Sequence, residues 1–174
     1  MKPLRFREVT ALEAWLEKNH AKADEVWLII AKKHAQGLHI VDALDAALCF
    51  GWIDGVRRSH DEDTFLQRYT PRRAGSSWSK INVDKVAALT AAGRMRASGN
   101  AQVELAKADG RWQAAYVAQR EFTVPDDVWS ALKSKRAAFM KLEKGAQYLA
   151  LLPVLKATTP QMRATRIERF VAHL

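Results

Sequence analysis

The chain has 174 residues, of which 48% are hydrophobic and 27% charged, and its formal net charge is +9 at pH 7. This composition is that of an ordinary globular protein, and it excludes long disordered stretches because those require low hydrophobicity. A single cysteine, Cys49, excludes an internal disulfide bond and any metal site built from several cysteines.

The first part of the chain shows helix and strand patterns in alternation. Residues 10–20 carry apolar side chains at helical spacing, which predicts an amphipathic helix. Residues 26–30 form a short continuous apolar run, which is typical of a buried strand. Residues 41–50 return to helical spacing, and Gly51 is a residue that commonly stops a helix.

Residues 52–70 predict a β-hairpin. Two runs rich in β-favouring residues flank the polar tip formed by residues 60–63. Pro71 then ends the second strand, because proline cannot donate a hydrogen bond to a β-ladder.

From Trp78 onward the patterns predict helices, with Asn82 and Thr159 as N-caps of the first and the last. The predicted helices cover residues 83–93, 98–110, 111–119, 125–135, 135–145, 146–157 and 160–174. The sequence therefore predicts an α+β fold, with a small N-terminal sheet, a hairpin and helices in residues 1–77. An all-helical C-terminal half, residues 78–174, follows and is expected to pack with the first half as one unit.

The excess of positive charge lies in the last quarter of the chain. Residues 128–174 hold nine basic and two acidic residues, a net charge of +7. Such a segment can attract phosphate groups or an acidic partner, although a solvated helix face has the same composition. We expect any nucleic-acid binding through it to be weak and non-specific, because no recognised nucleic-acid-binding module is present.

A second cationic stretch follows the hairpin. Residues 65–82, FLQRYTPRRAGSSWSKIN, contain four cationic side chains and no acid. Arg72 and Arg73 can present planar donors to a phosphate or carboxylate group. Ser77 can donate its hydroxyl, and Trp78 can stack on an aromatic ring.

These features predict a ligand site for a small anionic or aromatic molecule, with the candidate residues Trp52, Asp54, Arg72, Arg73, Ser77, Trp78 and Asn82. Adjacent residues of an extended segment point to opposite sides, so we expect one of the two arginines to be buried beside a carboxylate such as Asp54. The other arginine should be exposed. The alternative is that both arginines pair with acids and that Trp78 belongs to the core.

Asp54 lies between Gly51 and Gly55 and could be a general base, an anchor for an arginine or a turn residue. Acid–base catalysis normally needs a second tuned group. The chain contains no GxGxxG, P-loop or GxSxG motif, and its histidine spacings do not match a zinc site. We therefore assign no catalytic residue, no cofactor and no metal ligand.

The hydropathy of the chain bears on its location. Residues 1–20 carry charges throughout, unlike a signal peptide, and the most apolar run, YLALLPVL, is much shorter than the roughly 20 residues of a membrane helix. We expect a cytoplasmic protein without a membrane span.

Several longer strings occur together: ALCFGWIDG, DEDTFLQRYTPRRAGSSWSKIN, LTAAGRM, AKADGRWQAAY and VPDDVWSAL. In this order, over about residues 26–174, they resemble the YdeI/OmpD-associated family, also labelled bacteriocin-protection proteins. The resemblance implies a small bacterial cytoplasmic protein with a protective role, and no catalytic residues come with it. The chain departs from the family pattern at Gln147, at residues 157–158 and at residues 162–167, where cationic or polar residues are usual.

Three functions stay open from the sequence. The first is a non-enzymatic binding or stress-protection protein with an anionic or aromatic ligand or a protein partner. The second is an enzyme that uses Asp54 as a base and Arg72 and Arg73 as an anion clamp. The third is a weak nucleic-acid-binding protein that acts through its basic C-terminal helices.

Overall fold

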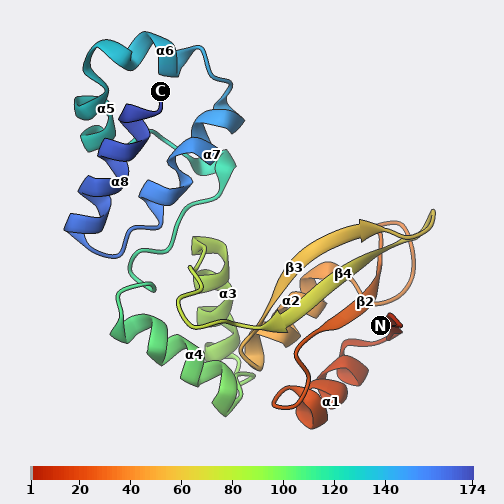
Figure 1. Ribbon diagram of the computed structural model, residues 1–174. Coiled ribbons are helices and arrows are strands. Elements are labelled where there is room, and N and C mark those ends of the chain that lie inside the picture. Colours follow the sequence, from red (N-terminus) through yellow and green to blue (C-terminus); the bar gives the residue numbers. More distant parts are fainter. Residues whose placement is uncertain (1) are drawn as a thin grey trace. The chain divides into compact units, whose positions relative to one another are not determined.

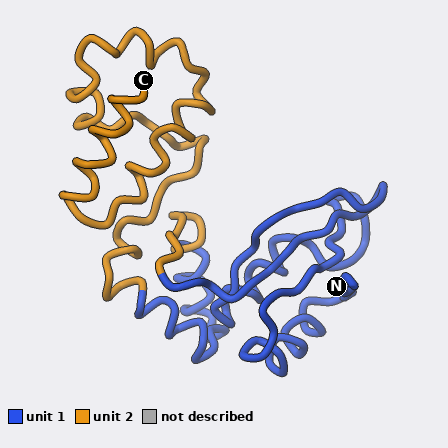
Figure 2. Tube along the Cα trace, in the orientation of Figure 1, with its two compact units in different colours: residues 1–74, 84–105 blue, residues 75–83, 106–174 orange. Residues whose placement is uncertain are grey.

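A four-stranded sheet and a series of helices make up the protein, whose computed structural model describes residues 2–174 (Figure 1). The chain forms two compact units, residues 1–74 with 84–105 and residues 75–83 with 106–174 (Figure 2). The α+β class predicted from the sequence is confirmed. The predicted boundary after residue 77, and the packing of the two halves as one unit, stay predictions.

The sheet belongs to the first unit and consists of β1 (Leu4–Arg5), β2 (Val26–Ala31), β3 (Trp52–Ser59) and β4 (Thr64–Pro71), in the order β1-β2-β4-β3. β1 pairs with β2 in parallel, and the other pairs are antiparallel. The predicted hairpin is therefore β3 and β4, and its second strand ends at Pro71 as expected. The register of β3 against β4 shifts between Asp54 and Arg57, which marks an irregularity of the bulge type in this edge strand.

Two helices of the first unit lie where the sequence predicts them. α1 (Val9–Asn19) buries Leu12 and Leu16, and α2 (Ile40–Cys49) buries a stripe of small residues. The two helices pack against each other, and α2 also packs against β3. α2 ends at Cys49, two residues before Gly51, whose φ of +77° lies in the left-handed region that glycine adopts without strain.

α3 (Lys80–Ala91) and α4 (Ala97–Ala108) come next in the chain. α4 approaches the end of α2 so closely that a Cβ atom at Gly99 would lie 2.8 Å from the carbonyl carbon of Cys49 and nearer still to its oxygen. Glycine is therefore needed at this contact. Burial raises the pKa of the Cys49 thiol, which suits a structural rather than a nucleophilic cysteine.

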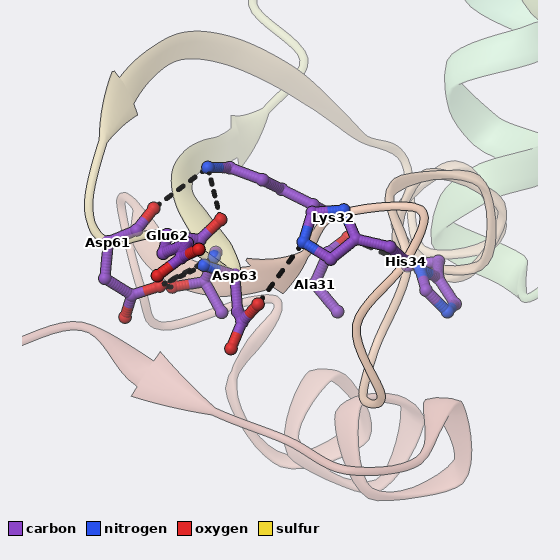
Figure 3. A network of polar contacts seen from close by, with 8 residues as sticks. Ala31, Lys32, His34, Asp61, Glu62 and Asp63 are labelled. Atoms are coloured by element: carbon purple, nitrogen blue, oxygen red, sulfur yellow. Dashed lines mark hydrogen bonds and ion pairs between the residues drawn. The ribbon is translucent and has the colours of Figure 1, made fainter.

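The tip of the hairpin is tied to the loop after β2 (Figure 3). The Lys32 ammonium donates to the carbonyl oxygens of Asp61, at 2.9 Å, and Glu62, at 2.7 Å. The His34 ring lies 3.2 Å from the carboxylate of Asp63. The acidic tip thus takes part in local contacts, and no cluster of three or more His, Cys, Asp or Glu in residues 2–174 is arranged to hold a metal ion.

The second unit contains a helical bundle of α5 (Asp126–Leu132), α6 (Arg136–Met140), α7 (Lys144–Leu155) and α8 (Pro160–Ala172), with short 3-10 turns at Gln119–Glu121 and Lys133–Lys135. Its core consists of Phe122, Val128, Leu132, Phe139, Tyr148, Leu151, Val154 and Ile167. No helix in residues 2–174 is both long and apolar enough to cross a membrane.

Two predictions in this unit have different outcomes. The helix predicted over residues 111–119 is wrong, because this segment forms turns and a β-bridge. The Tyr116 amide donates to the Trp78 carbonyl at 3.0 Å, and the Tyr116 carbonyl accepts from the Lys80 amide at 2.8 Å, so backbone pairing replaces the helix. The predicted N-cap of α8 is confirmed, because the Thr159 side chain accepts from the Met162 amide at 3.1 Å.

Candidate functional site

Trp52, one of the residues predicted for a ligand site, lies in the core of the first unit. Its side chain is 1% exposed, and its indole nitrogen donates to the carbonyl oxygen of His20 at 3.2 Å. Its ring meets Trp15 edge-on, with ring centres 6.0 Å apart. Trp52 therefore contributes packing area between the sheet and α1.

Asp54 is half-buried on β3, in the same unit. Burial raises the pKa of its carboxyl group, although its backbone amide and the charges of Arg57 and Arg72 oppose the shift. Arg72 is 7% exposed and Arg73 is exposed, so the expected difference between the two arginines is confirmed. The expected ion pair between Arg72 and Asp54 stays a prediction, and the charge of Arg72 does lower the pKa of Asp54.

Ser77, Trp78 and Asn82 belong to the second unit. The Trp78 ring is 2% exposed and packs on Trp112, with ring centres 4.9 Å apart, as the core alternative predicts. Asn82 does not cap α3, because the helix begins two residues earlier and the Asn82 amide donates to the Ser79 hydroxyl at 3.3 Å. Whether these residues or those on β3 and β4 touch a ligand stays a prediction.

A large open pocket, which we call the C-terminal pocket, lies in the second unit and has a volume of about 1290 Å³. Ser77 is the one predicted site residue that lines it. α7, α8 and the segments around residues 75–77 and 109–111 form its walls. Its apolar lining includes Leu142, Leu149, Leu152, Met162, Phe170 and Leu174.

Helix periodicity explains the apolar lining. α7 buries Tyr148, Leu151 and Val154 in the bundle core, so the neighbouring stripe of Leu149 and Leu152 faces the pocket. Leu149 is 65% exposed, so its apolar side chain is accessible at the pocket surface.

Cationic side chains form the rim of the pocket. Lys156, Arg166 and Arg169 line it, and none of them pairs with a carboxylate in residues 2–174. The Lys156 ammonium lies 4.6 Å from the centre of the Tyr116 ring, and Arg166 donates to the Pro153 carbonyl at 2.6 Å. Arg169 has no hydrogen bond or ion pair from its guanidinium within the described part of the chain.

The acid that lines the pocket does not neutralise this rim. Asp109 accepts two hydrogen bonds from the buried Arg111, at 2.8 and 2.7 Å, and Arg111 also donates to the Ser76 carbonyl at 2.8 Å. The pocket therefore combines apolar surface with uncompensated positive charge. This combination suits the binding of an anion that also has an apolar part.

Two features of the sequence are related to this pocket, although neither alone predicts it. The net charge of +7 over residues 128–174 and the apolar run of α7 were both apparent. The sequence alone does not show which face of α7 enters the bundle core, so it does not show that Leu149 lies outside it.

The fold and the pocket together define a small α+β protein of two units with a large pocket in its helical C-terminal unit. The chain belongs to the family described as Domain of unknown function (DUF8412), which matches residues 4–102. Residues 121–174 match the family described as Bacteriocin-protection, YdeI or OmpD-Associated, which confirms the resemblance for this segment. No curated protein and no solved structure matches the chain.

Proposed function

We propose that the protein is a non-enzymatic binding protein of a bacterial protection system and that the C-terminal pocket holds its ligand. The observation that carries this proposal is the presence of Lys156, Arg166 and Arg169, which have no carboxylate partners in residues 2–174, beside the exposed side chain of Leu149. The match of residues 121–174 to a bacteriocin-protection family supports the protective role.

The positive charge of the pocket rim restricts the kind of ligand that the protein binds. A cationic rim repels cationic peptides and attracts anionic groups, with an energy that falls as salt rises. We infer that the protein does not sequester cationic toxins, and that it binds an anionic component of the cell it protects. A cytoplasmic location, expected from the sequence, is part of this proposal, and cell fractionation checks it.

The test compares a bacterium that lacks the gene with strains that express variants. Arg169→Glu and Leu149→Gln change one cationic and one apolar lining residue, both at exposed positions where folding should be unaffected. Lys141→Glu and Met140→Gln are matched controls, because both residues are exposed and lie outside the pocket lining.

We expect the Arg169→Glu/Leu149→Gln double variant to be as sensitive to bacteriocin as the deletion strain. The Lys141→Glu/Met140→Gln double variant should protect like the wild type. Full protection by the pocket variant, at equal protein level, would refute the proposed function.

A further inference from the structure

The arrangement of the pocket cations points to the kind of ligand, and the inference that follows rests on the proposed function. Arg166 and Arg169 lie one turn apart on α8, and His173, the C-cap residue of this helix, follows at the same helical spacing, so the three residues form a row. At a rise of about 1.5 Å per residue, the row extends roughly 10 Å along the helix.

A second row runs along α7. Leu149, Leu152 and Lys156 follow one another three and four residues apart, and all line the pocket. α7 and α8 pack against each other, and residues 156–159 connect them. The pocket thus presents an apolar row from one helix and a cationic row from the next.

This geometry differs from that of a site for one small anion. A single phosphate or carboxylate is best held by donors that converge on it, whereas these cations are spread in a line. The volume of about 1290 Å³ also exceeds the range of roughly 300–1,000 Å³ usual for small-molecule pockets. The occupant should therefore be elongated, with anionic groups along its length.

We propose that the C-terminal pocket binds an acidic amphipathic helix of a partner protein. Apolar side chains of that helix, at spacings of three and four residues, would pack on Leu149 and Leu152. Carboxylates on the adjoining stripe would face Arg166 and Arg169. α7 has 12 residues, so about three turns of a partner helix fit along it.

The hollow shape of the site favours a helix over a membrane surface. The segments that contain Ser77 and Arg111 line the pocket in addition to α7 and α8, so its apolar surface lies in a depression and not on a single convex helix face. A bilayer is broad and meets convex faces, and helices that lie on it present their apolar side chains outward. A single helix is narrow enough to enter the hollow.

The experiment uses the full chain and a fluorescein-labelled peptide of about 14 residues, with leucines at helical spacing and glutamates on the adjoining stripe. A peptide of the same composition in scrambled order keeps the charge and removes the amphipathic pattern. Vesicles with an anionic phospholipid form a third probe. Binding is measured by fluorescence anisotropy at several salt concentrations, and helix formation by circular dichroism.

We expect the patterned peptide to bind and become helical, and the scrambled peptide to bind at least about tenfold more weakly. Arg166→Ala/Arg169→Ala should weaken binding by at least about tenfold, and Lys141→Ala/Lys144→Ala should leave it unchanged. An unchanged unfolding temperature of each variant shows that the fold is intact. If Arg166→Ala/Arg169→Ala destabilises the fold, Leu149→Gln alone tests the apolar row.

Three outcomes would overturn the inference: no binding of the patterned peptide, equal binding of the scrambled one, or vesicle binding that displaces the patterned peptide. The bacteriocin-protection assay shows whether the helical ligand alone is wrong or the proposed protective function is wrong as well. If pocket variants abolish protection and the peptide does not bind, the function stands and the helical ligand is wrong. If the variants protect fully, the proposed function falls.

Discussion

Arg163 of α8 holds the carboxylate of Asp127 in the first turn of α5 through two hydrogen bonds, of 2.6 and 2.9 Å. The same guanidinium donates to the Val154 carbonyl at the end of α7, at 3.3 Å. One side chain thus joins three helices of the bundle. Arg166, one turn later on the same helix, lines the pocket and has no carboxylate partner in residues 2–174.

Asp127→Asn should lower the free energy of unfolding at pH 7 by about 0.5–1 kcal/mol. The ion pair of Asp127 with Arg163 is partly exposed, and exposed ion pairs rarely stabilise a protein by more than this amount. Asp126→Asn is the matched control: Asp126 occupies the same first turn of α5 but has no ion pair in residues 2–174. Urea denaturation measures both. Equal losses in the two variants would mean that the helix dipole, rather than Arg163, accounts for the effect.

The same pair predicts a pH dependence. The hydrogen bonds from Arg163 lower the pKa of Asp127 below its ordinary value of 3.8. The stabilisation is therefore complete above pH 3.8 and is lost as the pH falls through the lower pKa of the folded state. Denaturation between neutral and acidic pH should show a smaller acid loss for Asp127→Asn than for the wild type.

Asp54→Asn should raise stability at neutral pH, by up to about 1 kcal/mol, the usual size of a single-residue effect. Burial raises the pKa of Asp54 above 3.8, so the folded state binds this proton more tightly than the unfolded state does. The folded state is then penalised as the pH rises from 3.8 through the raised pKa. The gain should vanish in strong acid, and Glu62→Gln at the exposed hairpin tip should show none. A loss of stability in Asp54→Asn would contradict this account.

Gly99→Ala should destabilise the first unit by about 1–3 kcal/mol, the usual effect of overpacking. The added methyl group would overlap the Cys49 carbonyl at the end of α2, and backbone must move to admit it. Gly55→Ala is the control, because the added Cβ would lie 3.8 Å from the Arg68 carbonyl oxygen, which is an ordinary contact. Thermal unfolding of the two variants should therefore differ clearly.

Thr159→Ala should cost about 1 kcal/mol, the typical effect of removing an N-cap side chain. The variant loses the hydrogen bond from the Met162 amide at the start of α8. Thr158→Ala, one residue earlier, keeps that cap and should be close to neutral. Hydrogen exchange of the first amides of α8 would locate the change, and equal protection in both variants would contradict it.

Local sequence patterns predicted most elements of the fold because their cause is local. α1 and α2 follow from helical spacing, α8 from its spacing and its capping residue Thr159, and the hairpin from its polar tip and Pro71. β1 has two residues, too few to carry a period, and it exists only through its pairing with β2. The helix predicted over residues 111–119 is wrong for a similar reason. The Tyr116 backbone pairs with a segment far away in the sequence, and local patterns do not show such pairing.

The candidate site was harder to predict, because a dense cluster of cations and rings in the sequence does not show which rings are buried. Trp52 and Trp78 both belong to packed cores. The pocket residues are spread over the chain from residue 75 to its end. Their common face depends on which side of α7 and α8 enters the bundle, and that is a property of the tertiary fold.

The irregular edge strand has a consequence for the behaviour of the protein at high concentration. β3 lies at one edge of the sheet, where a regular strand would offer its backbone to a second copy of the chain. The register shift after Asp54 interrupts that template, and the exposed Arg57 and Arg58 that follow place like charges opposite each other in any edge-to-edge dimer. The β3 edge is thereby protected against strand addition by a second copy of the chain, even at high protein concentration.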